Sequence, residues 1–233
     1  MRNLWFSLVL AAFLVALPLS ISALGLDIEA KAGGGLALGW TTNPNQTGTP
    51  GPDLVGGVDI DIYPFSFSGV DLGFSVGAEY AYLTNHGSLS ISTPFGNTTL
   101  KSDASFNYLI VPVAVSSRIP LSSGLDLAFR AGGFIGYFLG GSSTNTYNPE
   151  IVNLPFISLT NNTTTLDSST TVQWMYGLHF TGGADIRLAG NLFLAPSIVF
   201  DMGLTNTTGT SGYTYSDTLW SISAMIGVKY SAF

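Results

Sequence analysis

The stretch LGLDIEAKAGGGLALGW, residues 24–40, mixes apolar side chains with an aspartate, a glutamate and a lysine. Most of its apolar residues, from Leu26 to Trp40, recur at every second position, whereas Asp27, Glu29 and Lys31 occupy positions between them. Successive side chains of a β-strand point to opposite faces. The alternation therefore predicts a strand with one apolar face and one charged face.

The same alternation returns in seven further segments: residues 54–65, 70–84, 107–118, 124–140, 172–189, 191–204 and 219–233. The connections between the segments alternate in length, with short ones at 64–69, 118–124 and 188–191 and long polar ones at 41–53, 84–105, 140–170 and 205–217. Short turns at one end and long loops at the other are typical of outer-membrane barrels. The sequence therefore predicts an all-β fold, an eight-stranded antiparallel up-and-down transmembrane β-barrel.

The composition favours a surface that faces lipid. Only 9% of the residues are charged and 46% are hydrophobic, whereas soluble domains carry roughly 25% charged residues. The chain has no cysteine, which excludes a disulfide scaffold and thiolate chemistry.

The first 23 residues have the features of an export signal, with Arg2 before an apolar run that ends at Pro18 and the small residues of SISA after it. We expect a signal peptide at 1–23 and one barrel domain at 24–233; the alternative is an uncleaved membrane anchor helix. Without Arg2 the chain keeps 14 acidic and six basic side chains, a formal charge of −8. That charge disfavours nucleic acid as a partner.

The charged residues of the predicted strands all share the parity opposite to the apolar one. Glycine, serine and alanine fill the positions between them, which suits the interior of a narrow barrel. The predicted lumen-lining charges are Asp27, Glu29, Lys31, Asp59, Asp61, Asp71, Glu79, Asp126, Arg130, Asp185, Arg187, Asp201 and Lys229.

Aromatic residues on the apolar parity gather at strand ends, as expected for a girdle at a membrane interface. Seven lie near the long loops and Tyr230 lies at the opposite end: Trp40, Tyr80, Tyr82, Tyr137, Trp174, Tyr176, Trp220 and Tyr230. A soluble ligand-binding barrel, with its apolar face inside, would not restrict its aromatics to strand ends.

The segment NYLIVPVAV, residues 107–115, and the terminal Phe233 resemble features of the small bacterial outer-membrane barrels of the OmpA, OmpX and OmpW type. The resemblance covers the pattern of the whole chain and implies a porin-like bacterial surface protein in the outer membrane of a diderm bacterium. It also implies that Phe233 serves as the signal for the barrel-assembly machinery. Ser231 stands where that signal usually has a second aromatic, and Tyr230 is one residue away.

Two interpretations of the interior stay open. In the first, bases such as Arg130, Arg187 and Lys229 bridge carboxylates and plug a barrel that serves membrane structure or surface interaction, because buried charges need partners. In the second, unpaired acids line a narrow water-filled path that favours cations or small solutes.

We expect no enzymatic activity, cofactor or metal. His86 falls in a long loop and His179 on the inner face, and neither belongs to a recognisable catalytic motif. The expected partners are membrane lipid, the export and barrel-assembly machinery, and a host surface or small solute that contacts the loops. We expect a monomer.

Overall fold

The computed structural model describes residues 25–41, 46–93, 96–149, 162–166, 172–205 and 217–232. The predicted signal peptide, the segment IVNLPFISL of the third loop and Phe233 lie outside these residues. None of the helices in the described part of the chain is long and apolar enough to cross a membrane.

Long antiparallel strands make up almost all of the described residues. Their bounds are β1 Gly25–Thr41, β2 Gln46–Phe67, β3 Val70–Thr93, β4 Gly96–Ser122, β5 Leu125–Pro149, β6 Asn162–Leu166, β7 Trp174–Ala189, β8 Leu192–Gly203 and β9 Asp217–Ser231.

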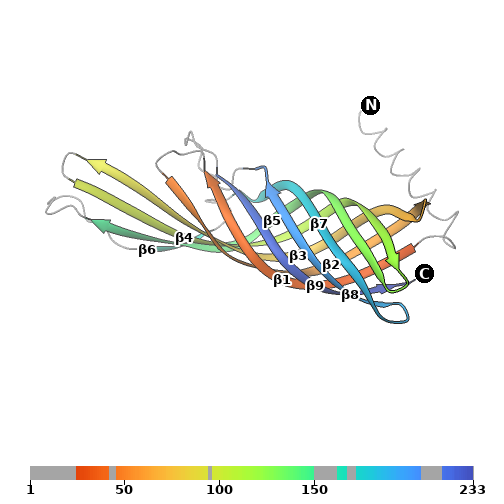
Figure 1. Ribbon diagram of the computed structural model, residues 1–233. Helices are drawn as coiled ribbons and strands as arrows, with labels where there is room; N and C mark the ends of the chain where they lie inside the picture. Colours follow the sequence, from red (N-terminus) through yellow and green to blue (C-terminus); the bar gives the residue numbers. More distant parts are fainter. Residues whose placement is uncertain are drawn as a thin grey trace, which may run out of the picture.

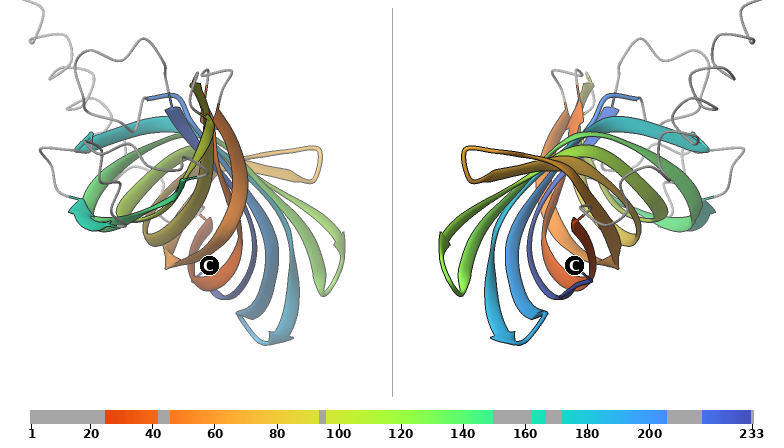
Figure 2. Two further views of the ribbon diagram at one scale, coloured as in Figure 1. Left: turned by 90° about the vertical axis from the view of Figure 1, so that its left-hand side faces the viewer. Right: turned by 90° about the vertical axis from the view of Figure 1, so that its right-hand side faces the viewer.

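The strands form a closed ring. Neighbours follow the order β4-β3-β2-β1-β9-β8-β7-β5-β6, and the additional pairing of β4 with β5 closes the sheet. Figure 1 shows the ring from the side and Figure 2 from its two ends. The predicted antiparallel up-and-down barrel is confirmed.

The short strand β6 adds a ninth strand to the eight predicted ones. It pairs with residues 141–145 of β5, whereas β7 pairs with residues 125–137 of the same strand. Strand β6 therefore lies in line with β7 along one side of β5, and the ring still has eight strand positions.

Burial alternates along the strands as the sequence pattern predicts. In β7 the pattern over Trp174–Ala189 begins with strictly alternating exposed and buried residues. In β1 the side chains of Asp27, Glu29 and Lys31 are buried, whereas Ile28 and Leu36 are exposed. The charged parity therefore faces the interior and the apolar parity faces outward.

The strands extend beyond the predicted ones. Within the predicted loop 84–105, residues 84–93 form the end of β3 and residues 96–105 the beginning of β4, and the two stay paired from Thr84–Ser105 out to Thr93–Gly96. Strands β2 and β5 likewise extend into 46–53 and 141–149. These segments are rich in β-branched threonine, which favours strands without apolar alternation. We call these segments, residues 46–53, 84–93, 96–105 and 141–149, the extension. Figure 1 shows the extension projecting past the ring at its long-loop end.

Two residues, Ser68 and Gly69, connect β2 to β3. Ser68 and Gly69 both have positive φ, 51° and 83°. Two successive positive φ values are typical of the type I′ turns that match the twist of a two-residue hairpin.

Candidate functional site

The interior of the barrel is where the charged side chains gather. Strand β1 supplies Asp27, Glu29 and Lys31, strand β2 supplies Asp59 and Asp61, and all five are buried. The register pairs Glu29 with Asp59 and Asp27 with Asp61. These acids therefore lie opposite one another across two strands and need cations close to them.

Arg130 of β5 supplies the central cation. Its Nη2 lies 2.6 Å from Glu29 Oε2 and 2.6 Å from Asp61 Oδ2, its Nε donates to Asp61 Oδ1 at 3.0 Å, and its Nη1 lies 3.1 Å from Asp59 Oδ2. A guanidinium offers five donors in a planar fork, so one side chain can bind several carboxylates. Arg130 thus connects β5 with β1 and β2 through the centre of the barrel.

Lys31 extends this network toward the long-loop end. Its Nζ lies 2.7 Å from Asp59 Oδ2 and 2.6 Å from Glu79 Oε1 of β3. All three side chains are almost fully buried. Because Asp59 contacts both Lys31 and Arg130, the two cations belong to one continuous network.

A second group of ion pairs lies nearer the short-turn end. Arg118 of β4 binds Asp71 at 2.9 Å and Asp27 at 3.0 Å, and its guanidinium lies 4.7 Å from the centre of the Tyr63 ring. Lys229 of β9 lies 2.7 Å from Asp185 and 4.0 Å from Asp27. Asp27 therefore contacts cations from two strands.

His179 of β7 forms a hydrogen-bonded relay on the inner wall. Its Nδ1 lies 2.7 Å from Asp201 Oδ1 and its Nε2 lies 3.0 Å from Thr181 Oγ1. This order of hydroxyl, imidazole and carboxylate resembles that of a hydrolase triad. However, all three side chains are buried, so the relay offers no open face to a substrate.

Buried acids outnumber buried bases in the described interior. Eight carboxylates are buried, against the three bases Lys31, Arg130 and Lys229; the acids are Asp27, Glu29, Asp53, Asp59, Asp61, Glu79, Asp185 and Asp201. Among them, Asp53 accepts a 2.7 Å hydrogen bond from Ser223. The excess requires hydration or bound protons, because an isolated carboxylate is costly to bury.

An apolar layer fills the interior above the network of Arg130 and Lys31, toward the long loops, and the buried Asp53 lies at its level, opposite Leu83. Its largest members are Tyr108, Phe134 and Phe138, and the rings of Tyr108 and Phe138 are 5.5 Å apart. Other members include Ala37, Val55, Ala81, Leu83, Ile110, Met175 and Leu219. Phe106 and Leu166 of β6 pack against this cluster, so β6 contributes to the layer.

Most of the charges predicted for the lumen lie in this interior, with three differences. Asp71 and Asp126 are only half-buried near the short turns. Arg187 is exposed, and instead of bridging carboxylates its guanidinium lies 5.3 Å from the centre of the Phe193 ring. Arg187 lies three residues before Gly190, which has a positive φ, and next to the register shift between Arg187 and Ala189 at the end of β7.

Sequence reasoning missed two charged residues of the interior, Asp53 and Arg118. Both have the inward parity of their strands, since Asp53 is two residues before Val55 and Arg118 two residues after Ser116, and both neighbours are buried. The sequence predicts a long polar connection at 41–53, which includes Asp53, and a short one at 118–124, which begins with Arg118. Extending the parity by one step at each strand end would have found them.

The predicted interface aromatics all lie on the outer surface. Trp40, Tyr80, Trp174, Tyr176 and Tyr230 are exposed, and Tyr82, Tyr137 and Trp220 are half-buried. Trp40 stacks on Trp220 at 5.9 Å, and Tyr137 packs edge-on against Trp174 at 4.9 Å.

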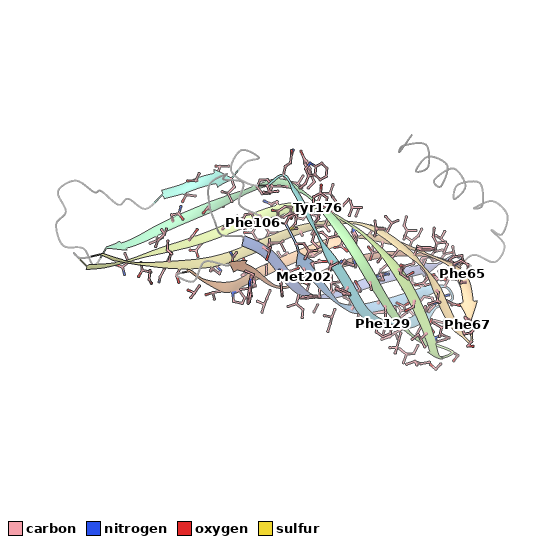
Figure 3. The ribbon with its side chains drawn as sticks, turned by 90° about the horizontal axis from the view of Figure 1, so that it is seen from above. Phe65, Phe67, Phe106, Phe129, Tyr176 and Met202 are labelled. Carbon is pink, nitrogen blue, oxygen red and sulfur yellow. The ribbon has the colours of Figure 1, made fainter. Side chains whose placement is uncertain are left out.

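A second aromatic belt, which the sequence analysis did not predict beyond Tyr230, occupies the short-turn end. Phe65, Phe67 and Phe129 are exposed there, and Figure 3 shows them at that end of the molecule, away from Phe106 and Tyr176. Apolar residues cover the outer surface between the two belts, including Ile60, Val76, Val113, Ile198 and Ile226. An exposed apolar band flanked by two aromatic belts matches the lipid-facing surface of a membrane barrel.

The closed ring, the apolar outer band and the charged interior together define a transmembrane β-barrel. The chain belongs to the outer membrane protein beta-barrel domain family, whose model matches residues 25–209. The protein is therefore an outer-membrane protein.

Solved structures with a similar fold include three small barrels. Neisserial surface protein A is 10% identical, with 88% of this chain and 96% of that chain covered and a TM-score of 0.40. The barrel domain of Pseudomonas aeruginosa OprF is 14% identical, with 88% and 97% covered and a TM-score of 0.36. The outer membrane protease OmpT from Escherichia coli is 10% identical, with 89% and 96% covered and a TM-score of 0.39. No curated protein matches the chain.

Proposed function

We propose that this protein is a plugged, non-enzymatic outer-membrane barrel that acts in membrane structure or surface interaction. The observation that carries the proposal is the filling of the interior by two successive layers. Arg130 joins carboxylates of β1 and β2 across the barrel, and the aromatic rings of Tyr108, Phe134 and Phe138 fill the space above.

One small cavity lies in the charged layer. A cavity of about 10 Å³ lies beside Glu29, Arg130, Asp185 and Ser197. That volume holds about one water molecule. A hydrated ion is larger than one water, so it would have to displace side chains in order to pass.

Burial of the histidine relay supports a non-enzymatic role. Thr181, His179 and Asp201 have the order of a catalytic triad, yet they lie inside the filled barrel. The exposed pair of His86 and Asp103, 2.6 Å apart, joins opposite positions of β3 and β4 in the extension. It is a cross-strand pair of the kind that stabilises a hairpin.

The surface available to partners is then the extension beyond the membrane and the lipid-facing band. We propose that the band contacts membrane lipid, that the export and barrel-assembly machinery delivers the chain, and that the barrel works as a monomer. A host surface or small solute would meet the extension, which is rich in hydroxyl and amide groups.

The second candidate is a narrow cation-leaning pore. The excess of buried carboxylates over buried bases favours it, because unpaired acids attract cations. Recording current across a planar bilayer that contains the refolded mature chain separates the two. The plugged barrel predicts a silent bilayer, and discrete cation-selective openings would establish the pore.

A further inference from the structure

A water-sized cavity lies inside the barrel, between side chains of four strands. Its volume is about 10 Å³, and Glu29 of β1, Arg130 of β5, Asp185 of β7 and Ser197 of β8 are among the residues that line it. A space of this volume holds about one water molecule. An ion that has shed its water shell is of similar size, so the cavity can hold one such ion as well.

Two buried oxygen atoms of the cavity residues have no hydrogen-bond partner among the atoms that the structure describes. They are Glu29 Oε1 and Ser197 Oγ. Glu29 is only 2% exposed, and its other carboxylate oxygen, Oε2, lies 2.6 Å from Arg130 Nη2. A carboxylate oxygen is costly to bury without a donor or a cation beside it. The two oxygens therefore indicate that the cavity holds a ligand.

Small residues keep the cavity open on the side to which Glu29 Oε1 is directed. A Cβ atom at Gly227 of β9 would lie 2.5 Å from this oxygen, and a Cβ atom at Gly183 of β7 would lie 2.8 Å from the Cβ of Ser197. Gly227 pairs with Ala195, which itself lines the cavity. Glu29 Oε1 thus faces the wall of β8 and β9 beside the cavity.

The cavity lies where two ion-pair networks of the described interior meet. Glu29 belongs to the first network and Asp185 to the second, and both line the cavity. The first network has two more acids than bases, and the second has one more. The first consists of Lys31, Arg130, Glu29, Asp59, Asp61 and Glu79, and the second of Arg118, Lys229, Asp27, Asp71 and Asp185.

A bound cation can compensate this excess in addition to hydration and bound protons. Because the cavity touches both networks, a positive charge placed in it is attracted by the surplus acids of each. Carboxylate and hydroxyl oxygens are the ligands that hard cations prefer. Glu29, Asp185 and Ser197 supply these two kinds of oxygen to the cavity.

The size and the charge of the surroundings favour a monovalent cation over a divalent one. Calcium takes about six to eight oxygen ligands, and magnesium usually keeps several water molecules, which a space of one water cannot hold. Arg130 lines the cavity and Lys229 Nζ lies 2.7 Å from Asp185, so both repel a double charge more strongly than a single one. In the described part of the chain, no three histidine, aspartate or glutamate side chains are grouped as a metal site.

We propose that the cavity binds one dehydrated alkali cation, represented by sodium, between Glu29, Asp185 and Ser197. The ion joins the two networks and stabilises the folded barrel. The inference goes beyond the proposed function, because a bound ion is compatible with a plugged interior. The recording of current across a bilayer tests the plug and leaves this site untouched, so the two proposals fail separately.

The dependence of stability on sodium concentration tests the site. The mature chain is refolded into phosphatidylcholine vesicles, and its unfolding in urea is followed in sodium chloride and in choline chloride at equal ionic strength. Choline is too large for the cavity. A ligand that binds only the folded state at one site stabilises it by mass action, so above the dissociation constant a tenfold rise in sodium should raise the folding equilibrium constant about tenfold.

Two serine variants provide the matched comparison. Ser197→Ala removes a hydroxyl that lines the cavity, whereas Ser116→Ala removes an equally partnerless buried hydroxyl on β4 that is not among the lining residues. Ser197→Ala should raise the sodium concentration that gives half of the stabilisation roughly tenfold, the effect of losing one contact to a charged group. Ser116→Ala should leave that concentration unchanged.

Equal stability in sodium and choline chloride at every concentration would overturn the proposal and leave the cavity to water. Stabilisation by calcium chloride without any by sodium chloride would also overturn it, since the ion would then be divalent. An equal shift in both serine variants would show that sodium acts outside the cavity. The sodium dependence of the natural protein remains decisive if Ser197→Ala does not fold.

Discussion

The charged lower layer and the apolar upper layer fill the same barrel by different means. In the lower layer, Arg130 and Lys31 connect carboxylates from several strands. Removing either cation leaves a buried carboxylate without its ion-pair partner. In the upper layer, Phe134 and Leu219 fill volume as members of one apolar cluster. The lower half of the interior therefore depends on charge pairing and the upper half on packing, so substitutions in the two halves should lower stability for different reasons.

The largest effect is expected from Arg130→Met. The substitution keeps a long side chain but leaves Glu29 and Asp61 without their shared cation. Breaking a buried ion pair costs about 3–5 kcal/mol, and the free energy of unfolding in urea with lipid vesicles should fall by that amount. The matched control is Arg187→Met at the exposed rim, expected to change it by less than about 1 kcal/mol. Equal losses would mean that the central network does not stabilise the fold.

The next effect belongs to the apolar layer. Leu219→Ala removes a side chain that is 4% exposed, and the resulting cavity should lower the free energy of unfolding by about 2–3 kcal/mol. Leu204→Ala, at a residue 60% exposed near the end of β8, should cost less. Raising the pH should leave the Leu219→Ala loss unchanged, because no charge is involved. A loss that changed with pH would show that charged groups also stabilise the apolar layer.

A smaller effect is expected in the histidine relay. Thr181→Val keeps the shape of the side chain but removes the hydroxyl that contacts His179 Nε2. An unsatisfied buried nitrogen costs about 1–2 kcal/mol. Thermal unfolding followed by gel migration measures the loss, with exposed Thr165→Val as the control. A Thr181→Val protein as stable as the parent would show that the ring nitrogen finds water instead.

The smallest effect concerns the turn between β2 and β3. Gly69 has φ of 83°, a conformation that costs a side-chain-bearing residue about 1 kcal/mol. Gly69→Ala should therefore lower the free energy of unfolding by about that amount. It should have little effect on the rate of refolding into vesicles. Ser123→Ala, in the turn between β4 and β5, serves as the control. A loss several times larger would indicate that this turn does more than connect two strands.

Strict alternation made the barrel and its inward charges predictable, because parity assigns a side chain to one face. The alternation did not predict the apolar layer, although Leu83, Ile110 and Phe134 face inward. In the sequence, an apolar residue at an inward position looks the same as an irregularity of the strand. The sequence did not predict the extension, because its serine and threonine residues do not alternate with apolar residues. Backbone pairing, which does not depend on side-chain polarity, forms strands from residues 84–93 and 96–105.

Each of the two layers closes the barrel without help from the other. Single-channel recording in planar bilayers tests it with the natural chain, the charged-layer variant Arg130→Ala, the apolar-layer variant Phe134→Ala/Phe138→Ala, and their combination, each checked for heat-modifiable migration. We expect silence from the natural chain and from each single-layer variant, and cation-selective openings from the combination alone. Discrete openings in the natural chain, or in a variant with only one layer altered, would contradict it.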